Sequence, residues 1–146
     1  FMALRGKKMK SWKLPIQTSG ERFYDISKEV CSSLKSKFSD KSGLLIIYNP
    51  HTSCGLTISE SFDSSAKEDM QKFLKHLAPR NLAFIEHTAE GPDDSPSHMK
   101  SILLETSLQL IVEEGEVQMG QWQGIYLCEF RDSNKTRNLQ LKFIVG

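Results

Sequence analysis

The stretch from His87 to Lys100 constrains this sequence more than any other, because it combines turn formers with chemically active side chains. Its fourteen residues include two histidines, three carboxylates, a lysine, a glycine and two prolines. The glycine and the prolines interrupt regular structure, as a surface loop requires. A loop does not require imidazoles on either side of acids, so we expect a functional site in this stretch.

The residues on either side of the acidic loop predict elements that meet there. The apolar run Leu82–Ile85 predicts a strand that ends at His87. Pro96 predicts the start of a helix, which would place His98 in the first helical turn. The positive end of the helix dipole favours anions at that position. A strand end that faces a helix start is a suitable frame for a binding site.

Composition places the chain among ordinary soluble globular proteins. It has 146 residues, of which 38% are hydrophobic and 25% charged. The net charge of +1, with basic and acidic residues interleaved, predicts neither a nucleic-acid partner nor a membrane partner. Three widely separated cysteines without a CxxC motif favour a reducing, cytoplasmic location. We expect a single domain over residues 12–146, preceded by a frayed or expression-derived arm over residues 1–11.

Apolar patterning predicts an α+β fold that is mostly antiparallel sheet, sandwich-like, with two to three helices. Trp12–Thr18 contains a proline and reads as an edge strand. The continuous apolar run Leu44–Tyr48 reads as a central strand buried on both faces. The clearest alternation predicts a hairpin of Gly124–Arg131 with Arg137–Val145. A helix capped by Ser64 or Ser65 follows the second strand region.

Three of the four histidines lie at predicted element boundaries, namely His51, His87 and His98. Imidazoles from three separate segments are a common ligand set for zinc or another divalent metal ion, with one position left open. The alternative is that each is a surface or hydrogen-bonded histidine, and pattern alone leaves both interpretations open. His76 lies between lysines within a predicted helix and is expected to be exposed.

Polar residues near these histidines are candidates for catalysis and substrate binding. Glu90 and Asp94 are candidate acids or bases, although a solvated acidic loop explains them as well. Lys100 is a candidate partner for a substrate phosphate, and its alternative is an ordinary lysine on a helix surface. Thr52 and Ser53 follow His51 directly and offer hydroxyl groups for substrate binding. Cys54 is unconvincing as a nucleophile and is expected to be small and buried.

A glycine-framed aromatic segment supplies the last candidates. Trp122 is predicted to stack on a ligand ring and Gln123 to hydrogen-bond it. The alternative is a core or interface tryptophan in a β-bulge. Residue patterns alone therefore lead to a compact α+β domain with a histidine–carboxylate pocket.

Three segments closely resemble the YjbQ-like family, a family of small proteins related to the so-called secondary thiamine-phosphate synthase. They are His51–Ser53, Glu86–Lys100 and Gly120–Glu129. The likeness extends from about Trp12 to Gly146. The sequence departs from the family pattern at Ser59, Glu105 and Gln121, none of which is a proposed ligand.

The resemblance implies an antiparallel α+β fold, a homotrimer and a pocket near the shared histidines that binds a divalent metal ion, most simply zinc. It also implies that a hydroxymethylpyrimidine diphosphate is joined to a thiazole phosphate, with release of pyrophosphate. The family positions match residue by residue, and the matching residues are His51, Glu60, Asp69, His87, Glu90, Asp94, His98, Lys100, Trp122, Gln123 and Glu129.

Three classes of function remain open from sequence. The first is a metal-dependent transferase of the thiamine-phosphate type, acting on a small phosphorylated substrate. The second is another metal-dependent phosphoester enzyme, in which the metal ion activates water. The third is a non-catalytic trimeric protein that binds a small phosphorylated or carboxylated ligand. A sequence resemblance transfers fold more securely than it transfers substrate.

Overall fold

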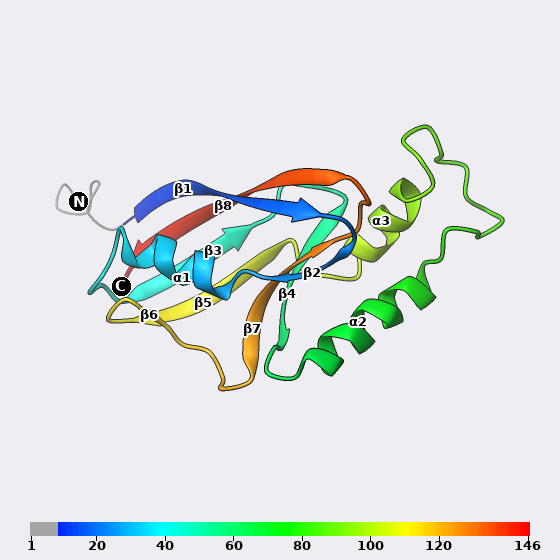
Figure 1. Cartoon of the computed structure of the whole chain (residues 1–146). Helices are drawn as coiled ribbons and strands as arrows, with labels where there is room; N and C mark the ends of the chain where they lie inside the picture. The colour runs from blue at the N-terminus through cyan, green and yellow to red at the C-terminus, as the bar shows by residue number, and fades with distance from the viewer. Residues whose placement is uncertain (1–8) are drawn as a thin grey trace.

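A computed structural model describes residues 9–146, which form two antiparallel sheets and three helices (Figure 1). The five-stranded sheet has the order β1 (Met9–Ser19), β8 (Asn134–Val145), β3 (Gly43–Tyr48), β5 (Ser107–Glu113) and β6 (Glu116–Val117). The three-stranded sheet has the order β2 (Arg22–Asp25), β7 (Gln123–Glu129) and β4 (Cys54–Glu60). The helices are α1 (Ser27–Lys35), α2 (Ser64–Leu77) and α3 (Asp94–Ser101).

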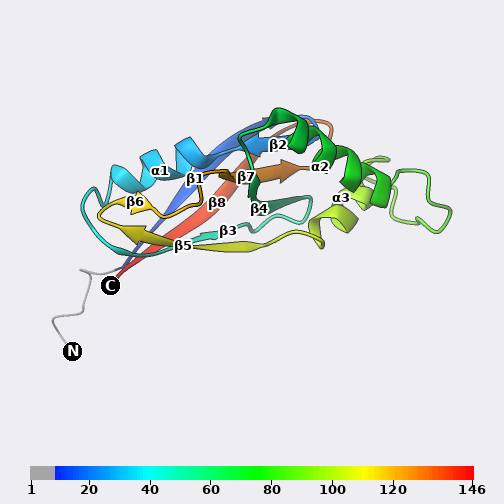
Figure 2. The same ribbon diagram turned by 90° about the horizontal axis from the view of Figure 1, so that it is seen from below.

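The elements are distributed unevenly along the molecule. The start of β1 and the C-terminus lie at one end, whereas α2, α3 and the loop between them lie at the other (Figure 1). Figure 2 shows α1 and α2 on one side, with β3 and β5 on the opposite side. No helix within residues 9–146 combines the length and the apolar character needed to cross a bilayer.

The main core lies where the five-stranded sheet faces α1 and the strands β4 and β7 of the smaller sheet. Leu45 and Ile47 on β3 are fully buried in it, and α1 contributes Val30 and Leu34 from one helical stripe. A smaller cluster of buried residues lies under α2 and is formed by Phe23, Leu74, Tyr126, Cys128 and Phe130. Together these clusters hold β4 and β7 in place. The start of β4 and the residues after the end of β7 lie at the candidate site.

The predicted fold class is confirmed, with three helices and mostly antiparallel sheet. The edge position of β1 is also confirmed, since it pairs only with β8 among the described strands. The central position of β3 between β5 and β8 is confirmed, but its burial is one-sided because Leu44 and Ile46 are only half-buried. Of the arm predicted over residues 1–11, the last three residues belong to β1, and residues 1–8 lie outside the described part of the chain.

The predicted hairpin between Gly124–Arg131 and Arg137–Val145 is wrong. The first strand, β7, pairs with β2 and β4, whereas β8 pairs with β1 and β3 in the other sheet. The short connection therefore carries the chain from one sheet to the other. Alternation of apolar and polar residues indicates that a strand has an inner and an outer face, but it does not identify the strand that pairs with it.

Two predictions near the candidate site are corrected as well. Leu82–Ile85 forms no strand and belongs to the long loop between α2 and α3, where Phe84 is 68% exposed. Helix α3 begins at Asp94 rather than near Pro96, so His98 lies in its second turn. At α2 the cap is Asp63, whose Oδ1 accepts a hydrogen bond from the Ser65 amide at 2.9 Å, rather than Ser64 or Ser65.

Candidate metal-binding site

A cavity of about 810 Å³ opens between the loop before β4, the loop before α3, and α3 itself. Its volume is typical of small-molecule sites. The cavity contains all three histidines of the predicted ligand set. Its lining residues are His51, Thr52, Cys54, His87, Ser95, His98, Ser101, Ile102, Leu104 and Thr106.

Two of these histidines meet at one buried carboxylate. His87 Nε2 lies 2.7 Å from Asp94 Oδ2, and His98 Nε2 lies 3.3 Å from Asp94 Oδ1. The ligand atoms of His87, Asp94 and His98 all lie within 4.8 Å of one another. Asp94 and His98 are four residues apart on α3, a spacing that places side chains on the same helix face. A donor set of two imidazoles and one carboxylate suits zinc and other first-row divalent ions.

A hydrogen bond at Nδ1 of His98 fixes the tautomer of the ring and so determines what Nε2 offers to Asp94. His98 Nδ1 lies 2.8 Å from the Thr52 carbonyl oxygen, which can only accept a hydrogen bond. The proton of the neutral ring is therefore on Nδ1, and Nε2 turns a lone pair toward the carboxylate of Asp94. Two acceptors facing each other are satisfied by a proton or by a cation between them. Metal-binding histidines commonly donate their other N–H to a backbone carbonyl in this way.

His51 shares the cavity but uses one ring nitrogen internally. Its Nε2 accepts a hydrogen bond from the Asn138 amide at 3.0 Å, which places the proton of the neutral ring on Nδ1. Burial, together with the nearby positive charge of Arg137, lowers the pKa of His51 below 6.5. His51 is thus a neutral donor at the edge of the cavity, and its role as a third histidine ligand stays a prediction.

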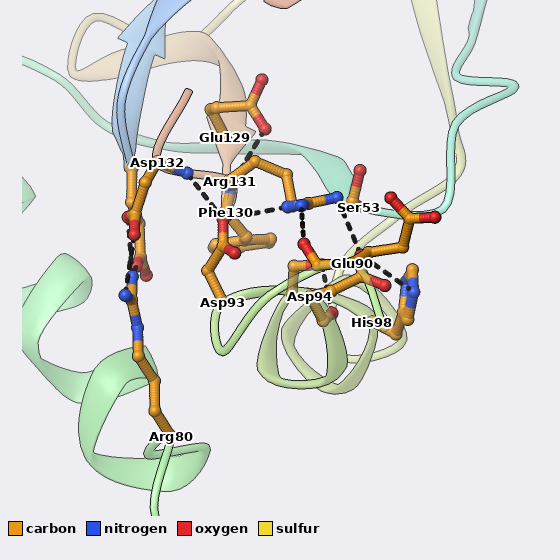
Figure 3. Close-up of polar contacts among 12 residues, drawn as sticks. Ser53, Arg80, Glu90, Asp93, Asp94, His98, Glu129, Phe130, Arg131 and Asp132 are labelled. Atoms are coloured by element: carbon orange, nitrogen blue, oxygen red, sulfur yellow. Dashed lines mark hydrogen bonds and ion pairs between the residues drawn. The ribbon is translucent and has the colours of Figure 1, made fainter. Parts of the chain in front are cut away.

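Arg131 holds the acidic loop in position, and sequence reasoning missed it. Its Nε donates to Asp93 Oδ2 at 2.9 Å, and its Nη1 donates to Asp94 Oδ1 at 2.8 Å (Figure 3). Its Nη2 donates to the backbone carbonyl of Glu90 at 2.9 Å. The Glu90 side chain itself is exposed. One guanidinium group thus fixes the loop at three points, among them the carboxylate that faces the two imidazoles.

The hydrogen bond from Arg131 affects the pKa of Asp93. Burial alone would raise the pKa of Asp93, but hydrogen bonds from Arg131 and the Asp132 amide outweigh burial and lower it. Asp93 is therefore ionised and available to hold the guanidinium group. Arg131 lies two residues after the end of β7, far in the sequence from its partners on the acidic loop, so this pairing leaves no local signal.

A second ionic cluster supports the loop that carries His51 and Thr52. Glu129 is fully buried and accepts hydrogen bonds from Arg137 Nε at 2.7 Å and Thr18 Oγ1 at 2.6 Å. Arg137 Nη2 also donates to the hydroxyl oxygen of Ser53 at 2.8 Å. Ser53 is 8% exposed and is engaged inside the protein, so its predicted role as a substrate ligand gains no support from its position.

Lys100 does not face the histidines, contrary to the expected role near a phosphate in the same cavity. Two residues along an α-helix turn a side chain by about 200°, so Lys100 lies on the opposite side of α3 from His98. Its Nζ donates to Glu21 Oε2 at 2.6 Å. Lys100 is only 2% exposed, so it is not the helix-surface lysine of the alternative interpretation either.

Trp122 and Gln123 lie at the far end of the three-stranded sheet. Gln123 pairs with Glu60, whereas the cavity borders Cys54 at the other end of β4, roughly 20 Å along the strand. Trp122 is 49% exposed and packs edge-on against Phe62 at 4.7 Å between ring centroids. Gln123 Oε1 accepts a hydrogen bond from the Gly120 amide at 2.8 Å. The cavity lining includes neither residue, and their substrate-binding roles stay predictions.

Cys54 borders the cavity without being a nucleophile. It is 1% exposed, and burial raises the pKa of its thiol to about 12. A thiol with that pKa carries almost no thiolate near neutral pH. The position agrees with the expectation of a small, buried cysteine.

Comparison with known proteins assigns the chain to a family. The family model described as UPF0047 protein YjbQ-like matches residues 12–146. The chain belongs to the YjbQ-like family. The UPF0047 protein YjbQ of Escherichia coli O157:H7 is 37% identical over 126 residues, which cover 86% of this chain and 91% of that protein. A UPF0047 protein of Methanocaldococcus jannaschii is 39% identical, over 85% of this chain and 86% of that protein.

Solved structures of YjbQ-like and similar proteins share the fold. A conserved hypothetical protein of Thermus thermophilus superposes with a TM-score of 0.81 at 32% identity, covering 91% of this chain and 99% of that chain. A YjbQ/UPF0047 protein of Clostridium acetobutylicum gives a TM-score of 0.80 at 30% identity, again with 91% and 99% coverage. None of these four names states a reaction, so function has to be argued from the site.

Proposed function

We propose that this YjbQ-like protein is a metal-dependent enzyme that acts on a small phosphorylated substrate in the histidine-lined cavity. The observation that carries the proposal is the buried Asp94 carboxylate facing two imidazole nitrogens, one of which has its tautomer fixed by the Thr52 carbonyl. These three side chains would hold a divalent cation, most simply zinc. When bound, the cation would act as a Lewis acid that neutralises charge on phosphate oxygens.

The remaining cavity residues offer hydrogen-bond donors to a phosphorylated ligand. Thr52 and Ser95 contribute hydroxyl groups to the lining, and His51 contributes its Nδ1–H. A neutral His51 donates to phosphate oxygens without competing for the cation, and its lowered pKa keeps it neutral at physiological pH. Ile102 and Leu104 add an apolar wall against which a heterocyclic ring would pack.

The specific reaction that we propose is the transfer implied by the family resemblance. The thiazole nitrogen would form a bond to the pyrimidine methylene carbon while the bond from that carbon to the diphosphate oxygen breaks. Pyrophosphate would leave with the electron pair. The hydroxyl groups of the cavity would stabilise the departing charge. Asp94 keeps the imidazoles in position. Glu90, an exposed acid in the loop before α3, is the candidate for passing a proton to the departing pyrophosphate.

A turnover comparison tests the proposal. Zinc-loaded protein is incubated with hydroxymethylpyrimidine diphosphate plus thiazole phosphate and, separately, with a panel of phosphoesters. We expect thiamine phosphate formation in the wild type and a loss of at least about 100-fold in His98→Ala. His76→Ala is the matched control, because His76 is exposed on α2 and does not line the cavity.

The outcomes separate the classes of function. Turnover of phosphoesters alone would indicate a different metal-dependent enzyme at the same site. Absence of turnover with every substrate, while the protein still binds them in a way that His98→Ala abolishes, would indicate a non-catalytic binding protein and contradict the enzyme proposal. The homotrimer implied by the resemblance is a separate proposal, which light scattering of the purified protein tests.

A further inference from the structure

A second cavity, of about 500 Å³, lies on the other side of α3 from the histidines. Lys100 from α3 lines it, whereas His98 from the same helix lines the first cavity. The charged residues of the second cavity are Glu21, Lys75, Arg80, Lys100 and Asp132. The proposed reaction uses none of them.

The lysine at this cavity is buried and only partly hydrogen-bonded. Lys100 Nζ donates to Glu21 Oε2 at 2.6 Å, and its side chain is 3% exposed. An ammonium group has three N–H donors, and Glu21 accounts for one of them among the described residues. The ammonium also lies 5.5 Å from the centre of the Phe130 ring. A buried ammonium with unused donors beside a cavity is a ready ligand for an anion.

Positive charge exceeds negative charge around the cavity. Arg80 donates through two nitrogens to Asp132, at 2.7 and 2.6 Å (Figure 3). This bidentate pair engages Asp132 with Arg80. Arg80 Nη2 also lies 3.4 Å from Glu21 Oε1, so Glu21 is shared between Arg80 and Lys100. Lys75 on α2 is exposed and adds a third positive charge to the lining. Three basic side chains thus face two acidic ones across a space large enough for a small ligand.

We propose that this second cavity binds a small oxyanion of the phosphate class, either free or as the terminal group of a metabolite. Lys100 would bind it at the floor of the cavity, and Lys75 and Arg80 would bind it at the rim. Two ammonium groups and one guanidinium group offer several charge-assisted hydrogen-bond donors, which suit the several oxygens of a phosphate group. The site is independent of the proposed metal-dependent reaction, since the two cavities share no lining residue.

Calorimetric titration of the full chain with inorganic phosphate tests the proposal. We expect saturable binding of one phosphate in the wild type and affinity at least about tenfold weaker in Lys75→Glu. Lys72→Glu is the matched control, because Lys72 is an exposed lysine on the same helix that does not line the cavity. His98→Ala should bind phosphate as the wild type does. Parallel titration with a phosphomonoester distinguishes a metabolite from the free ion, and binding of either supports the site.

A second variant tests the part played by Lys100 without removing it. Glu21→Gln withdraws the carboxylate charge beside the ammonium while leaving a side chain that can still accept its hydrogen bond. We expect phosphate to bind at least about threefold more tightly. The proposal is overturned if phosphate does not bind saturably, if Lys72→Glu weakens binding as much as Lys75→Glu, if His98→Ala abolishes binding, or if Glu21→Gln fails to strengthen it.

Discussion

Two buried carboxylates near the end of β7 differ in how completely the protein surrounds them. Glu129 accepts hydrogen bonds from Arg137, from the Thr18 hydroxyl and from backbone amides. Asp94 receives one guanidinium hydrogen bond from Arg131 and otherwise faces two imidazole nitrogens beside an open cavity. Both carboxylates are nearly inaccessible to solvent, so burial alone does not distinguish them.

The difference separates a structural cluster from a chemical one. In the Glu129 cluster, donors belonging to the protein meet the carboxylate from several sides, and nothing is left for a ligand. In the Asp94 cluster, the carboxylate accepts one hydrogen bond from Arg131 and faces imidazole nitrogens beside an open cavity, and we propose that a cation binds between them. We therefore expect changes at Glu129 and Arg137 to act on stability, and changes around Asp94 to act on metal binding.

The largest effect is expected when the closed cluster is broken. Arg137→Met removes the guanidinium group and leaves Glu129 charged and buried without its counter-ion. Removing one partner of a buried ion pair costs about 3–5 kcal/mol. Urea denaturation should show this loss in the free energy of unfolding. A loss below about 1 kcal/mol would mean that Glu129 does not depend on Arg137, and would remove the contrast between the two clusters.

The matching change in the open cluster should act on metal affinity. Arg131→Met removes the clamp on Asp94 while leaving the carboxylate and both imidazoles in place. We expect zinc affinity to fall by about 10–100-fold, the usual effect of losing a group that orients a metal ligand. Competition titration with a chelating dye measures this affinity, and Arg137→Met is the control. Equal weakening by both variants would show that the clusters act as one unit.

Acid should weaken the closed cluster in a predictable direction. Burial would raise the pKa of Glu129, but hydrogen bonds from Arg137 and Thr18 outweigh burial, and the folded-state pKa lies below 4.5. A carboxyl group with a lowered pKa stabilises the fold above its unfolded pKa and loses that contribution as pH falls through the folded value. Between pH 6 and 3, the wild type should therefore lose more stability than Glu129→Gln, in urea denaturation at each pH. Parallel curves for the two proteins would contradict this assignment.

The smallest effect concerns the thiol of Cys54, which borders the cavity. Because burial raises the pKa of Cys54 to about 12, iodoacetamide should label it far more slowly than the half-buried Cys31 at pH 8. Burial also raises the pKa of Cys31, so even this reaction should be slower than that of a free thiol. Mass spectrometry of timed digests measures both. Labelling of Cys54 as fast as Cys31 would show that the cavity wall opens readily.

The sequence predicted the fold class because the apolar patterns of β1, β3, β5 and α1 are local. It mispaired β7 with β8 because alternation does not identify a strand's neighbour. The boundary positions of His51, His87 and His98 likewise predicted that they lie together, and the structure places all three in one cavity.

Long-range contacts account for what the sequence did not predict at the site. Arg131 is separated by 37 residues from Asp94, and Lys100 by 79 from Glu21. Neither pairing leaves a local pattern. The start of α3 also mattered, since its beginning at Asp94 places Asp94 and His98 four residues apart on one helix face and so brings Asp94 toward the imidazoles. Sequence signals place the ends of a helix only to within one or two residues, so they did not predict which side chains of this short helix face the cavity.

Zinc titration of the purified apo-protein tests the central claim most directly, because it measures whether the Asp94 cluster binds a cation at all. We predict one equivalent bound in the wild type and in the control His76→Ala, with affinity at least about 100-fold weaker in His87→Ala and His98→Ala. His51→Ala then decides whether His51 is a third histidine ligand beside His87, Asp94 and His98. Absence of saturable zinc or manganese binding by the wild type, or unchanged affinity in His87→Ala, would contradict the account.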